Sequence, residues 1–309
     1  MVFAILIGFE YRIVTVAPDG KKTESINFPG TFVDLDWAYQ WCRDQKFDTA
    51  IITDIAADNT PTGITKAVVT GRVNMRSLNF YAETSKDYRR VTDRKSFIDT
   101  LTSELSKIAA NTSWDKKLFI YYTGHGHAMA AGKSSFLLPT GEPFDFDEIR
   151  TLLTSNLDER VEILGILDCC YPTGMRLPYK LSPKNTWDLL PDYKACKQEF
   201  LLITAATPTQ TSVATQFGSL FTKMFFEYLH RLNEPLPTDS KEIPWPSRNL
   251  LKIADHVSRE IKDQKYDTAQ TLNIYSAYKV LPIIPLWIGN LRYSIEISMK
   301  GKMIMLIEK

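Results

Sequence analysis

The chain has 309 residues, 44% of them hydrophobic, which suffices for one large α/β domain with a sizeable core. Lys and Arg number 37 and Asp and Glu number 36, so a net charge of +1 gives no reason to expect a nucleic-acid or acidic-membrane partner. No apolar run reaches the ~20 residues of a membrane span, and the first residues carry neither the basic start nor the cleavage site of a signal peptide.

The four cysteines are Cys42, Cys169, Cys170 and Cys196. They are too few and too irregularly spaced for a disulfide framework in a chain of this length. The adjacent pair Cys169-Cys170 is also a poor candidate for an unstrained bridge. We therefore expect reduced thiols and an intracellular, cytoplasmic setting.

Short apolar runs alternate with helical patterns, which predicts a mostly parallel, six-stranded sheet with helices on both faces. In chain order, the expected elements are a strand at Val2–Ile7, a helix at Thr31–Asp44 with Thr31 as N-cap, a strand at Thr49–Thr53, a helix to about Ala110 with Asp93 or Thr92 as N-cap, a strand at Lys117–Tyr122, a helix at Phe144–Leu157, strands at Val161–Leu167 and Phe200–Ala205, helices at Ser219–Leu232 and Arg248–Gln264, and a strand at Thr271–Ala277.

Three segments fall outside this alternation. Asp58–Arg90 is broken by Pro and Gly and reads as an insertion, with Val68-Val69 and Leu78–Ala82 as candidate short strands. Arg176–Lys197 is polar and without a clear period, so we expect an exposed loop. The tail Ile295–Ile307 has two apolar-rich stretches around a Lys-Gly turn, which predicts a β-hairpin that covers a sheet edge or contacts a partner.

Two of the predicted strands end in reactive residues. One ends in Thr123-Gly124-His125-Gly126 and the other in Asp168-Cys169-Cys170. Ligands of open parallel sheets bind beyond the carboxyl ends of the strands, so neighbouring strands would make His125 and Cys170 face one another. An imidazole can take the proton of a thiol and later return it to a leaving amine. The backbone amides of Gly126 and Cys170 could then point at the developing oxyanion.

A strand ending in Tyr-Tyr-Thr-Gly-His-Gly, followed by one ending in Asp-Cys-Cys, resembles the caspase/metacaspase family of cysteine peptidases. The spacing from His125 to Cys170 is close to the roughly 50 residues expected of caspases. Met1–Tyr11 resembles the first strand of the family, and Gly30-Thr31-Phe32-Val33-Asp34 is similar to its first helix entry. Ile203–Leu229 resembles the small-subunit region, including its Gly-Ser-Leu-Phe-Thr stretch.

The resemblance implies a caspase-like fold in which the chain divides into a peptidase domain and a C-terminal extension. Residues 1–285 form the peptidase domain, with a large-subunit-like part at 1–175, a linker at 176–199 and a small-subunit-like part at 200–285. Residues 286–309 form the C-terminal β-hairpin extension. The linker is either a solvated connection or a site of self-cleavage between the two parts.

The resemblance also assigns roles. The family places its nucleophile at the second position after the Asp, which is Cys170, and turns Cys169 into the core. In metacaspases, acidic residues equivalent to Asp34 and Asp168, with a hydroxyl at the position of Thr123, line the pocket for the residue before the cut bond.

The chain is more similar to metacaspases than to caspases at this pocket, because the Arg that caspases carry before the first helix entry is missing from Phe28-Pro29-Gly30-Thr31. We therefore expect an endopeptidase that cleaves protein or peptide substrates after Arg or Lys through an acyl-enzyme, since a buried carboxylate pair favours a cation. The sequence does not assign an oligomeric state.

Several alternatives remain open. Tyr171-Pro172-Thr173-Gly174 is one residue longer than the metacaspase form, so an inactive caspase-like decoy or regulatory binding protein is the second hypothesis. Asp34 has an alternative role as a first-turn acid that complements its helix dipole. Zinc held by His125, His127, Cys169 and Cys170 is disfavoured, because adjacent cysteines do not easily reach one ion.

We expect no cofactor. Many metacaspases bind calcium through an acidic cluster, and Asp145, Asp147 and Glu148 lie near the expected place. However, the preceding Phe136–Pro139 lacks the usual Asp, and Leu177 occupies a position where another would be expected.

Overall fold

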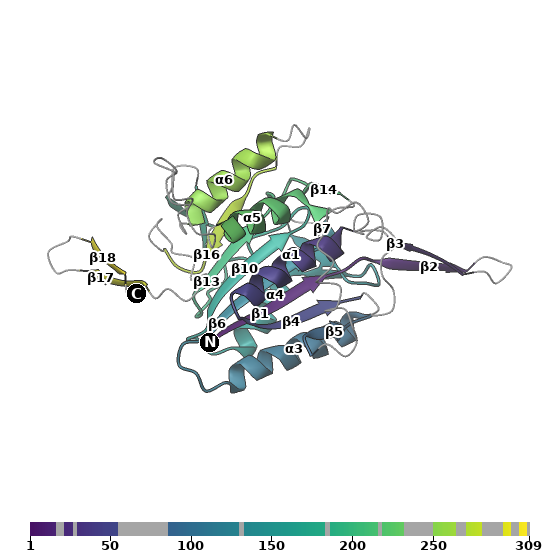
Figure 1. Cartoon of the computed structure of the whole chain (residues 1–309), viewed down its shortest axis with the longest axis horizontal. Helices are drawn as coiled ribbons and strands as arrows, with labels where there is room; N and C mark the ends of the chain where they lie inside the picture. Colours follow the sequence, from purple (N-terminus) through teal and green to yellow (C-terminus); the bar gives the residue numbers. More distant parts are fainter. Residues whose placement is uncertain are drawn as a thin grey trace.

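The structure is a computed structural model that describes residues 1–16, 22–26, 30–54, 86–129, 133–182, 186–215, 218–231, 250–263, 270–279, 293–297 and 303–307. The strands of its main sheet are β1 (Val2–Gly8), β4 (Asp48–Thr53), β5 (Tyr88–Arg90), β6 (Lys117–Thr123), β10 (Glu162–Asp168), β11 (Tyr179–Leu181), β12 (Trp187–Leu189), β13 (Phe200–Thr204) and β16 (Asn273–Ser276). In space they follow the order β12-β11-β16-β13-β10-β6-β1-β4-β5. The strands from β16 to β5 can be followed by their labels in Figure 1.

The central strands of this sheet are parallel. Every pair from β13 to β5 is parallel, whereas β16, β11 and β12 join antiparallel at one edge. All six strands predicted from the sequence are present, so the α/β class with a mostly parallel sheet is confirmed. The expected strand number is corrected from six to nine, because the three-residue strands β5, β11 and β12 are too short to show an alternating pattern.

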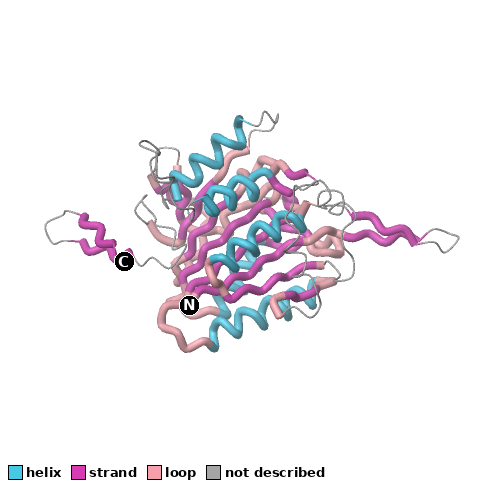
Figure 2. Tube along the Cα trace, viewed as in Figure 1, coloured by secondary structure: helices cyan, strands magenta, loops and turns pink. Residues whose placement is uncertain are grey.

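Within the described residues, five helices cover the two faces of the sheet: α1 (Thr31–Asp44), α3 (Arg94–Ala110), α4 (Phe146–Asn156), α5 (Leu220–Arg231) and α6 (Leu250–Asp263). Figure 2 shows them running along the strands. Side chains alternate between the two faces of a strand. On β6, Phe119 and Tyr121 therefore join α1, α5 and α6 in one core, which we call the α1-side core. Ile120 and Tyr122 join α3 and α4 in the other, the α3-side core.

The helix starts agree with the sequence at α3 and differ at α1. Of the two candidate caps, Asp93 and Thr92, Asp93 caps α3: its carboxylate accepts from the backbone N–H of Ser96, and the Ser96 hydroxyl accepts from the backbone N–H of Asp93. At α1 the N-cap is Gly30, not Thr31. The Thr31 hydroxyl donates instead to the carbonyl of Phe9 (3.0 Å), and so ties the helix start to the end of β1.

In the described part of the chain, four small sheets accompany the main one: β2 (Arg12–Val16) with β3 (Lys22–Ile26), β7 (Gly126–Ala128) with β8 (Ser134–Leu137) and β9 (Pro143–Asp145), β14 (Ala214–Thr215) with β15 (Gly218–Ser219), and β17 (Tyr293–Ile297) with β18 (Met303–Ile307). The last pair confirms the predicted C-terminal hairpin. The β2–β3 hairpin was not predicted, and Figure 2 shows it projecting beyond the sheet at the right of the view.

The expectation of an exposed loop at Arg176–Lys197 is corrected in part. Tyr179 and Lys180 pair with Ser276 and Tyr275 of β16, and β12 then pairs with β11. These short strands extend the antiparallel edge of the sheet. The candidate strands at 68–69 and 78–82 lie outside the described residues. Within the described residues, no helix is both long and apolar enough to cross a membrane.

Candidate active site

The two strands that end in reactive residues are neighbours. Strands β6 and β10 pair in parallel, with Thr123 opposite Asp168 at their carboxyl ends. Beyond these strand ends, both segments line one small pocket. The pocket is lined by Thr123, Gly124, His125, Asp168, Cys169, Cys170, Ser212, Ala214 and Ser219. The adjacency that the sequence argument requires is therefore present.

Gly126 packs directly on the peptide of Cys170. A Cβ atom placed on Gly126 would lie 1.7 Å from the carbonyl oxygen of Cys170 and 3.0 Å from its nitrogen. Only a residue without a side chain permits this approach. The contact brings together the two backbones that the sequence assigns to the oxyanion hole.

Burial changes the proton affinities of both reactive side chains. It raises the pKa of the half-buried Cys170 thiol above its ordinary value, with the nearby Asp168 carboxylate acting in the same direction. It lowers the pKa of His125 below its ordinary value. At neutral pH these shifts favour a neutral thiol and a neutral imidazole. The Cys170 thiol points to the backbone carbonyl of Ser212, at 3.9 Å.

Asp34 reaches this region from the first turn of α1. Its side chain is only 1% exposed. One carboxylate oxygen accepts from the Thr123 hydroxyl (2.8 Å), and the other accepts from the backbone N–H of Ser219 (2.7 Å). Gly218, at a φ of 97°, passes so close that a Cβ there would lie 2.5 Å from the carboxylate. Asp34 thus joins β6 to the start of α5, which goes beyond complementing the dipole of its own helix.

Asp168 is the second buried carboxylate, at 2% exposure. Its oxygens accept from the hydroxyls of Ser212 (2.8 Å) and Thr222 (2.5 Å). Burial raises the pKa of both Asp168 and Asp34, and the negative charge of Asp168 adds to the increase at Asp34. The structure thus places two acids with a high proton affinity beside the pocket, where a bound cation would restore their charge.

Sequence reasoning missed the residues that hold these acids. Ser212, Ser219 and Thr222 lie far along the chain from Asp168 and have no motif of their own. Ser219 and Thr222 belong to the Gly-Ser-Leu-Phe-Thr stretch, whose resemblance to the small-subunit region was the available signal. That resemblance indicated the region in which these residues lie, but not that they hydrogen-bond to Asp34 and Asp168.

The zinc alternative is not supported by the positions of its four residues. Cys169 is 2% exposed and packs in the α3-side core, whereas His127 is exposed on β7. Within the described part of the chain, no group of three or more His, Cys, Asp or Glu residues could hold a metal ion. The burial of Cys169 agrees with the core position that the family resemblance implies.

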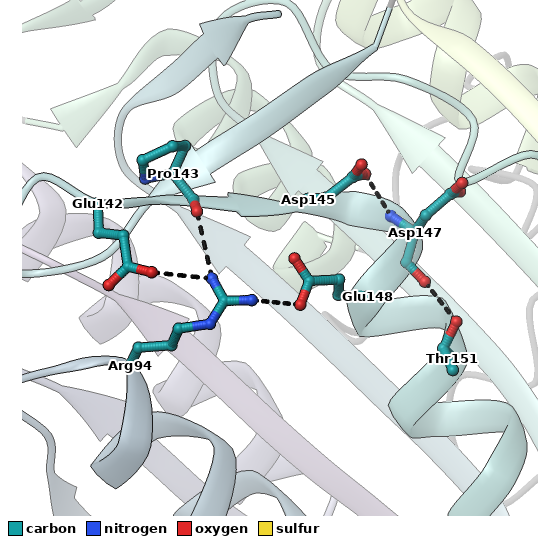
Figure 3. Close-up of polar contacts among 7 residues, drawn as sticks. All are labelled: Arg94, Glu142, Pro143, Asp145, Asp147, Glu148 and Thr151. Carbon is teal, nitrogen blue, oxygen red and sulfur yellow. Dashed lines mark hydrogen bonds and ion pairs between the residues drawn. The ribbon is translucent and has the colours of Figure 1, made fainter.

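The acidic cluster near α4 does not fit a calcium ion either, because its carboxylates already have partners in the protein. The Asp145 carboxylate caps α4 by accepting from the backbone N–H of Asp147 (2.8 Å) (Figure 3). Glu148 forms an ion pair with Arg94 (Figure 3). A calcium ion would have to displace these partners.

Asp147 itself is paired with cations from the segment that follows Cys170. Its carboxylate lies 2.9 Å from Nε of Arg176 and 3.9 Å from Nζ of Lys194. The carbonyl of Arg176 also accepts from the backbone N–H of Lys194 (2.9 Å). The positive charge beside Asp147 therefore comes from the chain itself.

Comparison with known proteins identifies the class. The family model described as "Caspase domain" matches residues 39–283, a span that contains both His125 and Cys170. The chain therefore belongs to the caspase-domain family, whose members are typically cysteine peptidases that act on proteins.

Two solved structures are similar to the chain. One is a protein from Geobacter sulfurreducens, GSU0716, with 15% identity, a TM-score of 0.53, and coverage of 94% of this chain and 97% of that chain. The other is caspase-1 from Spodoptera frugiperda, with 14% identity, a TM-score of 0.48, and coverage of 91% and 88%. The comparison with curated proteins gave no match.

Proposed function

We propose that the chain is a cysteine endopeptidase in which Cys170 is the nucleophile and His125 the general base. The observation that carries this proposal is that both side chains line one pocket, together with Asp168, at the carboxyl ends of two adjacent strands. Pairing of a thiol with an imidazole is the arrangement that acyl transfer requires.

In the reaction, His125 takes the proton of the Cys170 thiol as the sulfur bonds to the substrate carbonyl carbon. The backbone amides of Gly126 and Cys170 stabilise the oxyanion. When the C–N bond breaks, the proton on His125 passes to the leaving amine and a thioester remains. His125 then takes a proton from water, whose oxygen attacks the thioester and releases the acid and the free thiol. A neutral resting pair suits this sequence, because the imidazole is ready to accept a proton.

We infer that the enzyme cleaves after Arg or Lys, as metacaspases do. The support is the pair of buried acids, Asp34 and Asp168, beside the pocket. Burial makes their ionisation costly, and a guanidinium or ammonium group offsets that cost by charge-assisted hydrogen bonding. A substrate acid before the cut bond would instead repel both carboxylates.

The test is turnover of fluorogenic peptides that end in Arg, Lys or Asp. We expect hydrolysis of the Arg and Lys peptides and none by Cys170→Ala, with equal melting temperatures for the two proteins. If wild type and Cys170→Ala give equal rates, the peptidase proposal fails. If the Asp peptide is preferred, the pocket assignment fails while the mechanism stands.

A second candidate function is a caspase-like protein that binds peptides without cutting them. It is favoured by the backbone after the nucleophile, where Tyr171, Met175 and Arg176 all have left-handed φ values of 52°, 49° and 51°. Such residues are uncommon and store strain. Binding and turnover of the same Arg-ended peptide separate the two functions, because a decoy would bind the peptide without Cys170-dependent hydrolysis.

A further inference from the structure

Tyr11, which follows β1, lies directly against His125. Its ring centroid is 4.7 Å from that of the imidazole, at an angle of 43°. Its hydroxyl accepts from the backbone N–H of His125 (2.9 Å) and donates to the carbonyl of Leu137 on β8 (3.0 Å). One side chain therefore contacts both the backbone and the ring of the proposed base.

A second tyrosine completes this contact. The hydroxyl of Tyr122, the penultimate residue of β6, donates to the carbonyl of His125 (2.9 Å). The two phenol oxygens lie 3.0 Å apart. The N–H and the C=O of His125 are thus each held by a buried phenol. We call Tyr11 and Tyr122 the tyrosine clamp.

Gly124 shows how closely the tyrosine clamp fits the chain. Its φ is 148°, and a Cβ there would lie 2.7 Å from the hydroxyl of Tyr122 and 2.8 Å from that of Tyr11. The glycine between Thr123 and His125 is therefore needed to admit the two hydroxyls. Gly124 therefore makes room for the tyrosine clamp as well as for a substrate.

Tyr11 is itself held in place from a third strand. The carboxylate of Asp54, just after β4, accepts from the backbone N–H groups of Glu10 (2.8 Å) and Tyr11 (2.9 Å). Tyr11 has a left-handed φ of 54°, an uncommon conformation for a bulky residue. The two hydrogen bonds help to hold it there. The ends of β4, β1 and β6 are thus linked in series to His125.

The phenol of Tyr11 acts without exchanging a proton. Burial raises its pKa above the ordinary value, so the hydroxyl is protonated near neutral pH. It is therefore suited to hold a neighbour and unsuited to act as a base.

We propose that Tyr11 is a positioning residue that fixes the backbone and ring of His125 relative to Cys170. This inference rests on the proposed peptidase function wherever a turnover rate is measured. The contacts between Tyr11 and His125 do not depend on that function. General-base efficiency depends strongly on distance and orientation, and a displacement of about 1 Å can cost on the order of 100-fold. Loss of one of several contacts should have a smaller effect.

The test compares wild type with Tyr11→Phe, which keeps the ring and removes the hydroxyl. The matched control is Tyr39→Phe on α1, where a similarly buried phenol donates to Asp87 (2.9 Å) outside the pocket. Tyr11→Phe removes the hydrogen bonds of its hydroxyl with His125 and Leu137, and Tyr39→Phe removes one, each at a cost of about 1–3 kcal/mol in stability. Melting temperatures should therefore fall in both variants.

Two readouts separate positioning from stability. One is kcat and KM for an Arg-ended peptide, with enzyme concentration set by active-site titration. The other is the rate at which iodoacetamide alkylates Cys170 at pH 7, followed by mass spectrometry of the peptide that contains it. We expect Tyr11→Phe to lower kcat and the alkylation rate about tenfold with KM within twofold, and Tyr39→Phe to leave all three unchanged.

Alkylation requires no peptidase activity, so the two proposals can fail separately. If Cys170 in Tyr11→Phe reacts at the wild-type rate, positioning by Tyr11 is overturned, whatever the peptides show. If wild type cleaves no peptide but His125→Ala and Tyr11→Phe both slow alkylation, the peptidase proposal is overturned and the positioning role of Tyr11 is supported.

Discussion

Asp168→Asn is the substitution that tests the charge of the pocket most directly. Asn has the size of Asp and retains one carbonyl oxygen, so it can still accept from one of the two hydroxyls that hold Asp168, those of Ser212 and Thr222. What it removes is the negative charge. The matching change in the substrate is Arg to citrulline, which keeps the shape of the side chain and removes its positive charge.

The expected magnitude follows from the burial of Asp168, which is 2% exposed. Removing one partner of a buried, hydrogen-bonded charge pair costs about 3–5 kcal/mol. Each 1.36 kcal/mol is a factor of ten, so kcat/KM for an Arg peptide should fall roughly 150- to 5,000-fold. The same substitution should change kcat/KM for the citrulline peptide less than about tenfold, because no charge pair is lost there.

The assay measures kcat/KM for both peptides with both proteins, which gives a double-mutant cycle across the enzyme and the substrate. Cys170 alkylation serves as the control that the nucleophile remains intact. If Asp168→Asn lowers the rates of the two peptides by the same factor, Asp168 acts through structure or on the reacting groups. The assignment to substrate recognition would then be refuted.

Three further predictions follow from the geometry of the site. Burial lowers the pKa of His125 below its ordinary value of 6.5, so kcat/KM for the citrulline peptide should decline with a midpoint below pH 6.5 as the base becomes protonated. A midpoint at or above pH 6.5 contradicts this prediction. Gly126→Ala should abolish activity, because its Cβ would clash with the carbonyl oxygen of Cys170. Cys170→Ala adds no clash and should have the melting temperature of the wild type. An active Gly126→Ala enzyme would show that the close contact between Gly126 and Cys170 is not required. Calcium and a chelator should each change kcat/KM less than twofold, whereas Arg176→Ala, which removes the nearer of the two cations at Asp147, should lower it. Calcium activation of the wild type would contradict the fit of the ion pair.

The sequence predicts the parts of the site that depend on one strand and its end. The apolar runs of β6 and β10 are long enough to show in the sequence, and both end where the reactive residues begin. Parallel strands present their carboxyl ends at one edge, so His125 and Cys170 could be expected together once the strands were neighbours. The structure supplies that adjacency through the pairing of Thr123 with Asp168.

The sequence does not predict what depends on contacts between distant segments. Thr222 is 54 residues from Asp168, and Tyr11 is 114 residues from His125. No local pattern marks either residue, because a buried hydroxyl in a helix and a tyrosine after a strand are common. The strands β11 and β12 escape notice for a related reason, since their three residues are ordered by pairing with β16 and not by a period of their own.

The main sheet divides the site between two separately packed interiors. The acids that would select the substrate are fastened through Thr222 and the start of α5, above the α1-side core. The histidine is fastened through Tyr11 and Tyr122, which belong to the α3-side core. The proposed specificity acids and the proposed base are thus held from opposite faces of the sheet. Repacking the α1-side core is therefore expected to alter substrate preference first, and repacking the α3-side core to alter turnover first.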